Sequence, residues 1–277
     1  ITSLTKKLET AKAQNKLPKI IIPVHLSGQS CDMLAIHKLS KKYNFKIIED
    51  ASHAIGGKYL DNFIGSCEYS DITVFSFHPV KIITSGEGGM ATTNSKEIAD
   101  KLSIFRTHGI TRDENLIENE SDGPWYYEQI DIGYNYRMTD IQAALANSQM
   151  KRISKIVKRR HEIANIYNKE LENLPIKLPW QDAKTYSSFH LYVIRLDLNE
   201  IDVSHKAFFT KMRNAEILVN LHYIPVYLHP YYRRLGFKKG YCVEAEKYYS
   251  DAVSIPMYPS LKDEDQMKVI KTIKSII

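Results

Sequence analysis

Cysteine is scarce in this sequence, and long apolar runs are missing. Three cysteines, Cys31, Cys67 and Cys242, are scattered through 277 residues. Their number and spacing give neither a disulfide framework nor a zinc motif, and they suit a reducing cytoplasm, where we expect the protein to reside. No apolar run approaches the roughly 20 residues that a membrane-spanning helix needs. No basic, apolar and small-residue signal pattern occurs either, so we expect no membrane partner.

The sequence also lacks a strong excess of either acidic or basic residues. Lys and Arg number 38 against 32 Asp and Glu, which leaves a net charge of +6. A basic cluster over 151–160 carries much of it, and it is typical of the solvated face of a helix. Nucleic-acid binding is the alternative for this cluster, and it predicts steeply salt-dependent binding. We expect no nucleic-acid partner.

The stretch 45–89 organises the rest of the chain. It holds two short apolar strand candidates, 45–48 and 72–77, and the first is followed by Glu49 and Asp50. Strands joined by helical or loop crossovers indicate a parallel α/β sheet. Ligands of such sheets bind beyond the carboxyl ends of the strands. Asp50 and Lys81 both follow a strand's carboxyl end, so both could face one ligand.

A carboxylate and a lysine in these places suit one particular cofactor. A carboxylate buried alone costs several kcal/mol, and a protonated pyridine nitrogen would relieve that cost. A lysine can form a Schiff base with an aldehyde of the same ligand, and pyridoxal phosphate offers both groups. Each residue alone has a simpler interpretation, a helix N-cap for Asp50 and a solvated surface lysine for Lys81. Ser76 adds a hydroxyl that can bind phosphate, and the glycines of 84–89 permit a close approach of the backbone.

The pattern of apolar residues predicts further elements. Asp32 is suited to cap a helix and Asn44 to end it, and Thr139 with Gln142 forms a capping-box pattern. We expect a cofactor-binding domain over 1–150 and a linker helix with a smaller α/β domain over 151–277. The predicted helices are 3–16, 33–43, 95–104, 140–172, 207–217 and 262–276, and the predicted strands are 19–26, 45–48, 72–77, 88–94 and 188–198, with a connecting turn at 61–66 and a loop at 110–123.

Four motifs together resemble a known family. They are E-D-A-S-H-A (49–54), S-F-H-P-V-K (76–81), G-E-G-G (86–89) and G-Y-N-Y-R-M-T-D (133–140). They resemble the DegT/StrS family of sugar aminotransferases, and the resemblance covers essentially the whole chain. It implies a fold-type I enzyme with pyridoxal 5′-phosphate as cofactor. It also implies glutamate as amino donor and a UDP-linked 4-keto-deoxysugar as acceptor. The segments 124–129 and 221–233 look most like the branch of the family in pseudaminic acid synthesis.

The resemblance also implies roles for further residues. His53 would contact the cofactor ring, Asn135 the phosphate and Arg137 the substrate, the last two in the active site of a neighbouring subunit, so a homodimer is expected. The segment 221–233 would border the substrate, which nominates His222, Tyr227 and His229. Relatives commonly have a histidine where Tyr227 stands, whereas here a histidine stands at 229, so the resemblance implies a substrate contact that has either moved or changed. Both residues also have a simpler interpretation. Asn135 would hydrogen-bond the local backbone, and Arg137 would be a solvated surface cation.

Three alternatives accompany this interpretation. Family members carry a further N-terminal portion of the large domain ahead of the part matched here, so one alternative is a truncated, non-catalytic fragment. A second is an aminotransferase for a different nucleotide 4-keto sugar. A third is a deoxysugar dehydratase on the same scaffold. In those relatives a histidine replaces the Schiff-base lysine, so Lys81 argues against the third.

Overall fold

The computed structural model describes residues 1–277, and the chain divides into two compact units. The first unit comprises 1–26 and 30–153, and the second comprises 27–29 and 154–277. Each unit has a hydrophobic core of its own. The assignment of 1–150 to cofactor binding and of 151–277 to a linker helix and small domain stays a prediction.

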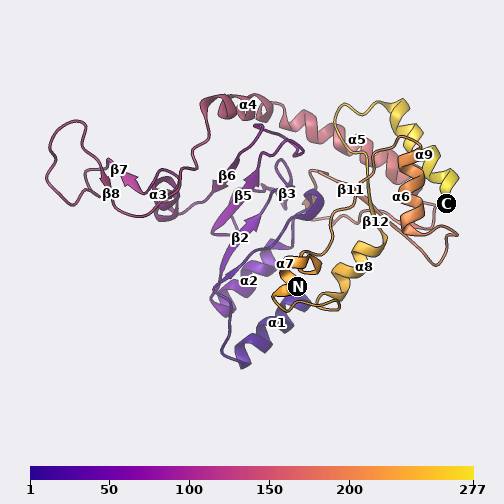
Figure 1. The fold of residues 1–277 in the computed structure, drawn as a ribbon, viewed down its shortest axis with the longest axis horizontal. Coiled ribbons are helices and arrows are strands. Elements are labelled where there is room, and N and C mark those ends of the chain that lie inside the picture. Colours follow the sequence, from indigo (N-terminus) through magenta and orange to yellow (C-terminus); the bar gives the residue numbers. More distant parts are fainter. The chain divides into compact units, whose positions relative to one another are not determined.

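A four-stranded sheet forms the centre of the first unit. Its order is β1-β2-β5-β6, with strands Ile20–Ile21, Lys46–Asp50, Ile72–Ser76 and Gly89–Thr92. β1, β2 and β5 are parallel, and β6 runs antiparallel to β5. Figure 1 shows β2, β5 and β6 side by side with α2 beside them. The structure confirms the predicted mostly parallel sheet and its antiparallel strand.

Helix α2 (Met33–Tyr43) connects β1 to β2, and both of its ends follow the predicted signals. The Asp32 side chain accepts a hydrogen bond from the Ala35 amide at 3.3 Å, which satisfies one free amide of the first turn. Asn44 ends the helix in the left-handed conformation. α2 contributes to the core of this unit, which gathers Leu8, Met33, Ile36, Tyr43, Phe45, Ile47 and Tyr59.

The first strand is shorter than predicted. The sequence predicts a strand over 19–26, but only Ile20–Ile21 forms β1, and beyond it Val24 makes an isolated bridge to Asp50. Pro23 explains the interruption, because proline has no amide hydrogen to contribute to a ladder. The Pro23 carbonyl still accepts a hydrogen bond from the Asp50 amide at 2.9 Å.

The remaining elements of the first unit are short apart from three helices. The predicted turn at 61–66 is part of a small hairpin of β3 and β4, and the predicted loop at 110–123 is irregular except for its first two residues, which form β7. Figure 1 shows α3 and the β7–β8 pair lying apart from the four-stranded sheet. These elements are α1 (Thr2–Ala13), η1 (Leu26–Gly28, shared between the units), β3 (Lys58–Tyr59), β4 (Asn62–Phe63), α3 (Lys96–Phe105), β7 (Ile110–Thr111), β8 (Glu128–Gln129) and α4 (Asp140–Met150).

The prediction of one continuous helix over 140–172 is wrong. The segment forms two helices, α4 (Asp140–Met150) and α5 (Ile153–Leu171). At the break the Arg152 amide donates to the Gln149 carbonyl three residues earlier, at 2.9 Å, so the α-helical hydrogen-bond pattern is interrupted. The start of α4 is as predicted, since Thr139 and Gln142 form a complete capping box.

The second unit packs helices against a three-stranded antiparallel sheet of order β12-β11-β9. Its core includes the fully buried Tyr167, Tyr192 and Phe208. The predicted strand over 188–198 is the shorter β11, and the predicted helices over 207–217 and 262–276 correspond to α6 and α9. The elements are α5, β9 (Ile176–Lys177), β10 (Thr185–Tyr186), β11 (Tyr192–Leu196), α6 (His205–Asn214), η2 (Val226–Leu228), α7 (Pro230–Arg234), α8 (Val243–Asp251), β12 (Ala252–Ile255) and α9 (Asp263–Ile276).

None of these helices combines the length and the apolar character required to cross a bilayer.

Candidate active site

Asp50 and Lys81 follow two neighbouring parallel strands. Asp50 is the last residue of β2 and is aligned with Val74 of β5. Lys81 lies five residues beyond Ser76, the end of β5, in a turn where its amide donates to the His78 carbonyl at 2.9 Å. The carboxyl ends of parallel strands meet at one edge of a sheet. The carboxylate and the amine therefore come from the same edge, as the sequence predicts.

The electrostatic environment links these two groups. Partial burial lowers the pKa of Lys81, and the negative charge of Asp50 opposes that change without cancelling it. Asp50 accepts a hydrogen bond from the Ser52 amide at 3.0 Å through Oδ1, while its Oδ2 has no protein donor. The site thus holds an amine that loses its proton more readily than an ordinary lysine, together with a carboxylate that has one oxygen available to a ligand.

The lowered pKa of Lys81 predicts its reactivity. Neutral amines react with acetic anhydride, so in the cofactor-free protein Lys81 should reach half-maximal acetylation at a lower pH than an exposed lysine. Lys96 is the internal control, because its hydrogen bond to Asp100 raises its pKa. Competitive labelling across a pH series, followed by peptide mass mapping, measures both midpoints. A midpoint for Lys81 equal to or above that of Lys96 would contradict this description of the site.

His53 and Ser76 lie next to these residues in the chain. His53 is buried in the turn that follows β2, where the Ala54 amide donates to the Ala51 carbonyl at 2.9 Å. Ser76 ends β5, and its Oγ accepts a long hydrogen bond of 3.4 Å from the His78 amide. Their predicted roles, a ring contact for His53 and a phosphate contact for Ser76, stay predictions.

The glycine-rich segment 84–89 has a clear structural function. Gly89 begins β6 opposite Ser76, and a side-chain carbon placed on it would lie 2.7 Å from the Phe75 carbonyl oxygen. Only glycine therefore allows β6 to approach β5 this closely. The close approach anticipated for these glycines is made to the neighbouring strand.

Asn135 and Arg137 are exposed in the loop ahead of α4. Asn135 makes an isolated bridge with Thr107, and no hydrogen bond or ion pair joins its side chain or that of Arg137 to Asp50 or Lys81. The structure does not bring these two residues together with the lysine site within the chain. Their assignment to the site of a neighbouring subunit stays a prediction.

The other predicted substrate residues belong to the second unit, where two of them have protein partners. The His222 ring hydrogen-bonds the Ser254 hydroxyl at 2.8 Å through Nδ1. The Tyr227 hydroxyl donates to Glu246 at 2.5 Å. His229 is exposed just ahead of α7. Substrate contacts by these residues stay predictions.

Sequence reasoning missed a buried carboxylate beside Asp50. Glu49 lies inside the first unit and is hydrogen-bonded to the ring of His25 at 2.7 Å. His25 is fully buried, and both of its ring nitrogens have hydrogen-bond partners. The sequence feature that could have predicted it is the pair of neighbouring carboxylates, Glu49 and Asp50, at the end of a strand. Strand alternation sends two such neighbours to opposite faces, so one of them must be accommodated away from the ligand.

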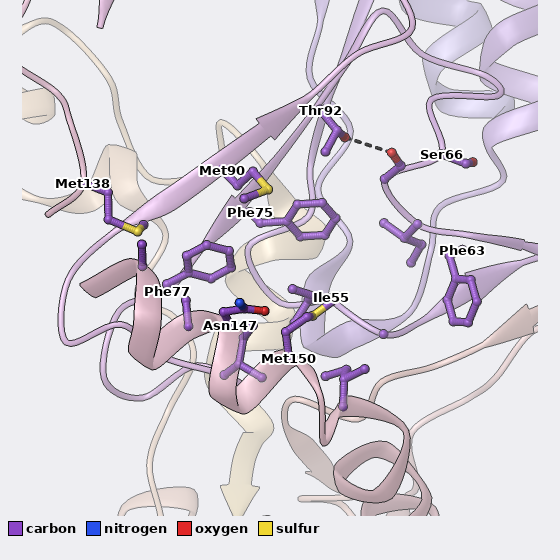
Figure 2. Close-up of a pocket in the computed structure, with 17 residues that line it drawn as sticks. Ile55, Phe63, Ser66, Phe75, Phe77, Met90, Thr92, Met138, Asn147 and Met150 are labelled. Atoms are coloured by element: carbon purple, nitrogen blue, oxygen red, sulfur yellow. Dashed lines mark hydrogen bonds between the residues drawn. The ribbon is translucent and has the colours of Figure 1, made fainter. Parts of the chain in front are cut away.

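A large apolar cavity lies elsewhere in the first unit. It has a volume of about 730 Å³, and Figure 2 shows Phe75, Phe77, Met90, Met138 and Met150 around it. The polar side chains in its lining are those of Ser66, Thr92 and Asn147, and none of the predicted site residues lines it. No group of three or more His, Cys, Asp and Glu residues is arranged to bind a metal ion. The cavity lining supplies neither an acid nor a base, whereas the edge of the sheet offers the carboxylate of Asp50 and the amine of Lys81.

The groups at that edge fit pyridoxal phosphate. The free oxygen of Asp50 suits a pyridinium N–H, and a partly buried amine of lowered pKa suits an aldehyde carbon. Ser76 supplies a hydroxyl at the end of the intervening strand β5. The donor set therefore matches the cofactor expected from the sequence.

Comparison with known proteins agrees with this geometry. The model of the DegT/DnrJ/EryC1/StrS aminotransferase family matches residues 3–274. The spore coat polysaccharide biosynthesis protein SpsC of Bacillus subtilis is 37% identical over 98% of this chain and 69% of its own length. The UDP-4-amino-4,6-dideoxy-N-acetyl-β-L-altrosamine transaminase of Campylobacter jejuni serotype O:2 is 36% identical, again over 98% of this chain and 69% of its own length.

Solved structures give the same result. The Helicobacter pylori aminotransferase PseC, described as involved in the biosynthesis of pseudoaminic acid, superimposes with a TM-score of 0.86 at 29% identity, over 98% of this chain and 70% of its own. The PLP form of a putative sugar aminotransferase from Streptococcus pneumoniae gives a TM-score of 0.82 at 29% identity, over 93% and 68% of the two chains. The α/β fold is that of the fold-type I sugar aminotransferases. The chain belongs to the DegT/DnrJ/EryC1/StrS family and is a pyridoxal phosphate-dependent aminotransferase.

Proposed function

We propose that this aminotransferase moves the amino group of glutamate to the 4-keto carbon of a UDP-linked deoxysugar, in the biosynthesis of pseudaminic acid. The observation that carries the proposal is the placement of Asp50 and Lys81 after neighbouring parallel strands, with the charge of one acting on the amine of the other. The names of the Campylobacter and Helicobacter relatives support this acceptor and pathway.

Lys81 has two functions in this proposal. As a neutral amine, its Nζ would hold the cofactor through the aldehyde carbon with release of water, and its lowered pKa favours that neutral form. Once released by the donor amine, the same Nζ would take the proton from the α-carbon of glutamate as a base and would return it, as an acid, to the cofactor carbon that carried the aldehyde. For the sugar acceptor the proton transfers run in the opposite direction.

Asp50 has a separate task. Its carboxylate holds a proton on the pyridine nitrogen, and its position at the end of β2 fixes where that proton lies. When bound, pyridoxal phosphate carries the amino group between the two substrates and accepts electron density from the reacting carbon. Glutamate leaves as 2-oxoglutarate, and the sugar ketone becomes an amine, so donor and acceptor exchange one amino group for one oxygen.

The remaining predicted residues complete the proposed site. Ser76 binds the phosphate and His53 contacts the ring. Asn135 and Arg137 of a second copy reach the phosphate and the substrate, in a homodimer with shared sites. Both side chains are exposed and lack polar partners in the single chain, which leaves them available for such a role. His222, Tyr227 and His229 are proposed to border the sugar.

A substrate panel tests the acceptor. The protein, expressed with any coding sequence that precedes Ile1, is incubated with glutamate and a 4-keto-deoxysugar linked to UDP, GDP or dTDP. We expect the UDP-linked sugar to give a 4-amino sugar in equal amount to 2-oxoglutarate, measured by chromatography with mass detection. Turnover confined to the GDP or dTDP sugar would contradict the proposed acceptor and favour an aminotransferase for a different nucleotide sugar.

A further inference from the structure

A buried polar cluster lies immediately behind Asp50. Strand alternation directs Glu49 to the face of the sheet opposite the Asp50 side chain. Glu49 is 5% exposed, and its neighbours His25 and Thr73 are fully buried. None of the steps assigned to Lys81 or Asp50 uses these three side chains, and a buried carboxylate in a strand is costly unless its hydrogen bonds are satisfied.

His25 binds to both of the last two residues of β2. Its ring Nε2 lies 2.7 Å from a carboxylate oxygen of Glu49, and its backbone amide donates to the Asp50 carbonyl at 3.0 Å. The Cys31 amide donates to the ring Nδ1 at 3.1 Å. Because Nδ1 is an acceptor, the ring proton lies on Nε2, where it donates to Glu49. One histidine thus links the segment after β1 to the end of β2.

Glu49 is held from the β5 side as well. Its second oxygen accepts hydrogen bonds from the Ser70 hydroxyl at 2.5 Å and the Thr73 hydroxyl at 2.9 Å. Burial raises the pKa of Glu49, but the hydrogen bonds from His25 and Ser70 outweigh it and hold the pKa below its ordinary value. The residue is therefore a buried carboxylate with three donors, and its position is fixed from two directions.

We propose that Glu49 and His25 are positioning residues, which lock the end of β2 so that the Asp50 carboxylate stays aligned with the pyridine nitrogen of the cofactor. This inference rests on the role proposed above for Asp50. The backbone of Asp50 is bonded on both sides to the segment after β1, through the Pro23 carbonyl and the His25 amide. Loss of the His25–Glu49 hydrogen bond would therefore weaken these backbone bonds and let the Asp50 carboxylate shift. Misplacement of a catalytic group by about 1 Å can cost about 100-fold in rate.

The first test replaces Glu49 by glutamine, which keeps the size and removes the charge. The glutamine amide would face donors on both sides, so it cannot reproduce all three hydrogen bonds. We expect the dissociation constant for pyridoxal phosphate, measured by absorbance, to rise about tenfold. The kcat should fall by a similar factor, with the KM for glutamate changed less than about twofold.

A double-mutant cycle shows whether Glu49 acts through Asp50. In an Asp50→Asn background, E49Q should change the cofactor dissociation constant by less than about twofold, because the group to be positioned has already lost its charge. Additive effects of the two substitutions would overturn the inference. If D50N alone leaves cofactor binding and turnover unchanged, the proposed role of Asp50 fails as well. If only the inference about Glu49 is wrong, D50N still weakens cofactor binding and turnover, whereas E49Q leaves both unchanged.

Two substitutions of His25 provide a matched pair that does not alter Glu49. His25→Gln can place an amide donor near the Nε2 position, whereas His25→Asn retains only an acceptor for the Cys31 amide. We expect H25Q to bind the cofactor within about threefold of the parent protein and H25N to match E49Q. His37→Asn is the control, because its ring bonds the Tyr69 carbonyl rather than Glu49, and it should leave cofactor binding unchanged.

Thermal unfolding of each cofactor-free variant separates positioning from stability. If E49Q and H25N lower Tm but leave the cofactor dissociation constant unchanged well below Tm, the cluster serves stability only and the inference is overturned. If E49Q does not fold, the contrast between H25Q and H25N still decides. Equal cofactor binding by that pair would also overturn it.

Discussion

Substitution of Lys81 by alanine is expected to abolish transamination, with a loss of about 10³-fold or more. In the proposed mechanism Lys81 supplies both the covalent link to the cofactor and the proton transfers, and partial burial lowers its pKa so that the neutral amine is available. Removing the amine ends both functions at once. The measurement is the rate of 2-oxoglutarate formation from glutamate, with cofactor added in excess.

Two controls make the Lys81 result specific. Lys81→Arg keeps a positive charge, but a guanidinium stays protonated, so it should be as inactive as the alanine variant. Lys96→Ala removes an exposed lysine paired with Asp100 on α3, and it should leave the rate unchanged. A purified Lys81→Ala protein that retains more than about a tenth of the parent rate would show that this lysine is not the catalytic amine.

Substitution of Asp50 by asparagine has the second-largest expected effect. The amide keeps the shape but no longer holds a proton on the pyridine nitrogen, and we expect kcat to fall by about 10²- to 10³-fold. The substitution should also be visible without any cofactor. The charge of Asp50 raises the pKa of Lys81 against the effect of burial, so its loss should move the acetylation midpoint of Lys81 to a still lower pH.

The control for this prediction is Asp61→Asn in the exposed turn between β3 and β4, which should change neither kcat nor the acetylation midpoint. An unchanged midpoint in Asp50→Asn would show that the two groups do not interact. An unchanged kcat would remove Asp50 from the mechanism.

Much of the site edge follows from local sequence signals. The apolar strands that end near Asp50 and Ser76, and the capped helix between Asp32 and Asn44, are determined by side-chain alternation and end-capping that a sequence displays directly. Parallel pairing of two such strands then places Asp50 and Lys81 at one edge. The structure confirms the paired strands and the capped helix, because each of them depends on signals between residues close in the sequence.

The parts that sequence reasoning missed depend on contacts between distant residues. No proline or glycine marks the break between α4 and α5 in the sequence. In the structure the break is seen in the Arg152 amide, which donates to the carbonyl three residues earlier instead of four. The Glu49–His25 bond joins residues 24 positions apart in sequence. Neither residue alone predicts the other, because a buried carboxylate can be satisfied by many different donors.

One measurement tests the central claim most directly, namely where pyridoxal phosphate attaches. The protein is mixed with pyridoxal phosphate, its visible absorption is recorded, and the complex is reduced with borohydride and mapped by peptide mass. The account predicts a yellow complex and a single reduced adduct on Lys81, absent from Lys81→Ala. An adduct on another lysine, or no adduct at saturating cofactor, would contradict the assignment of this edge of the sheet as the active site.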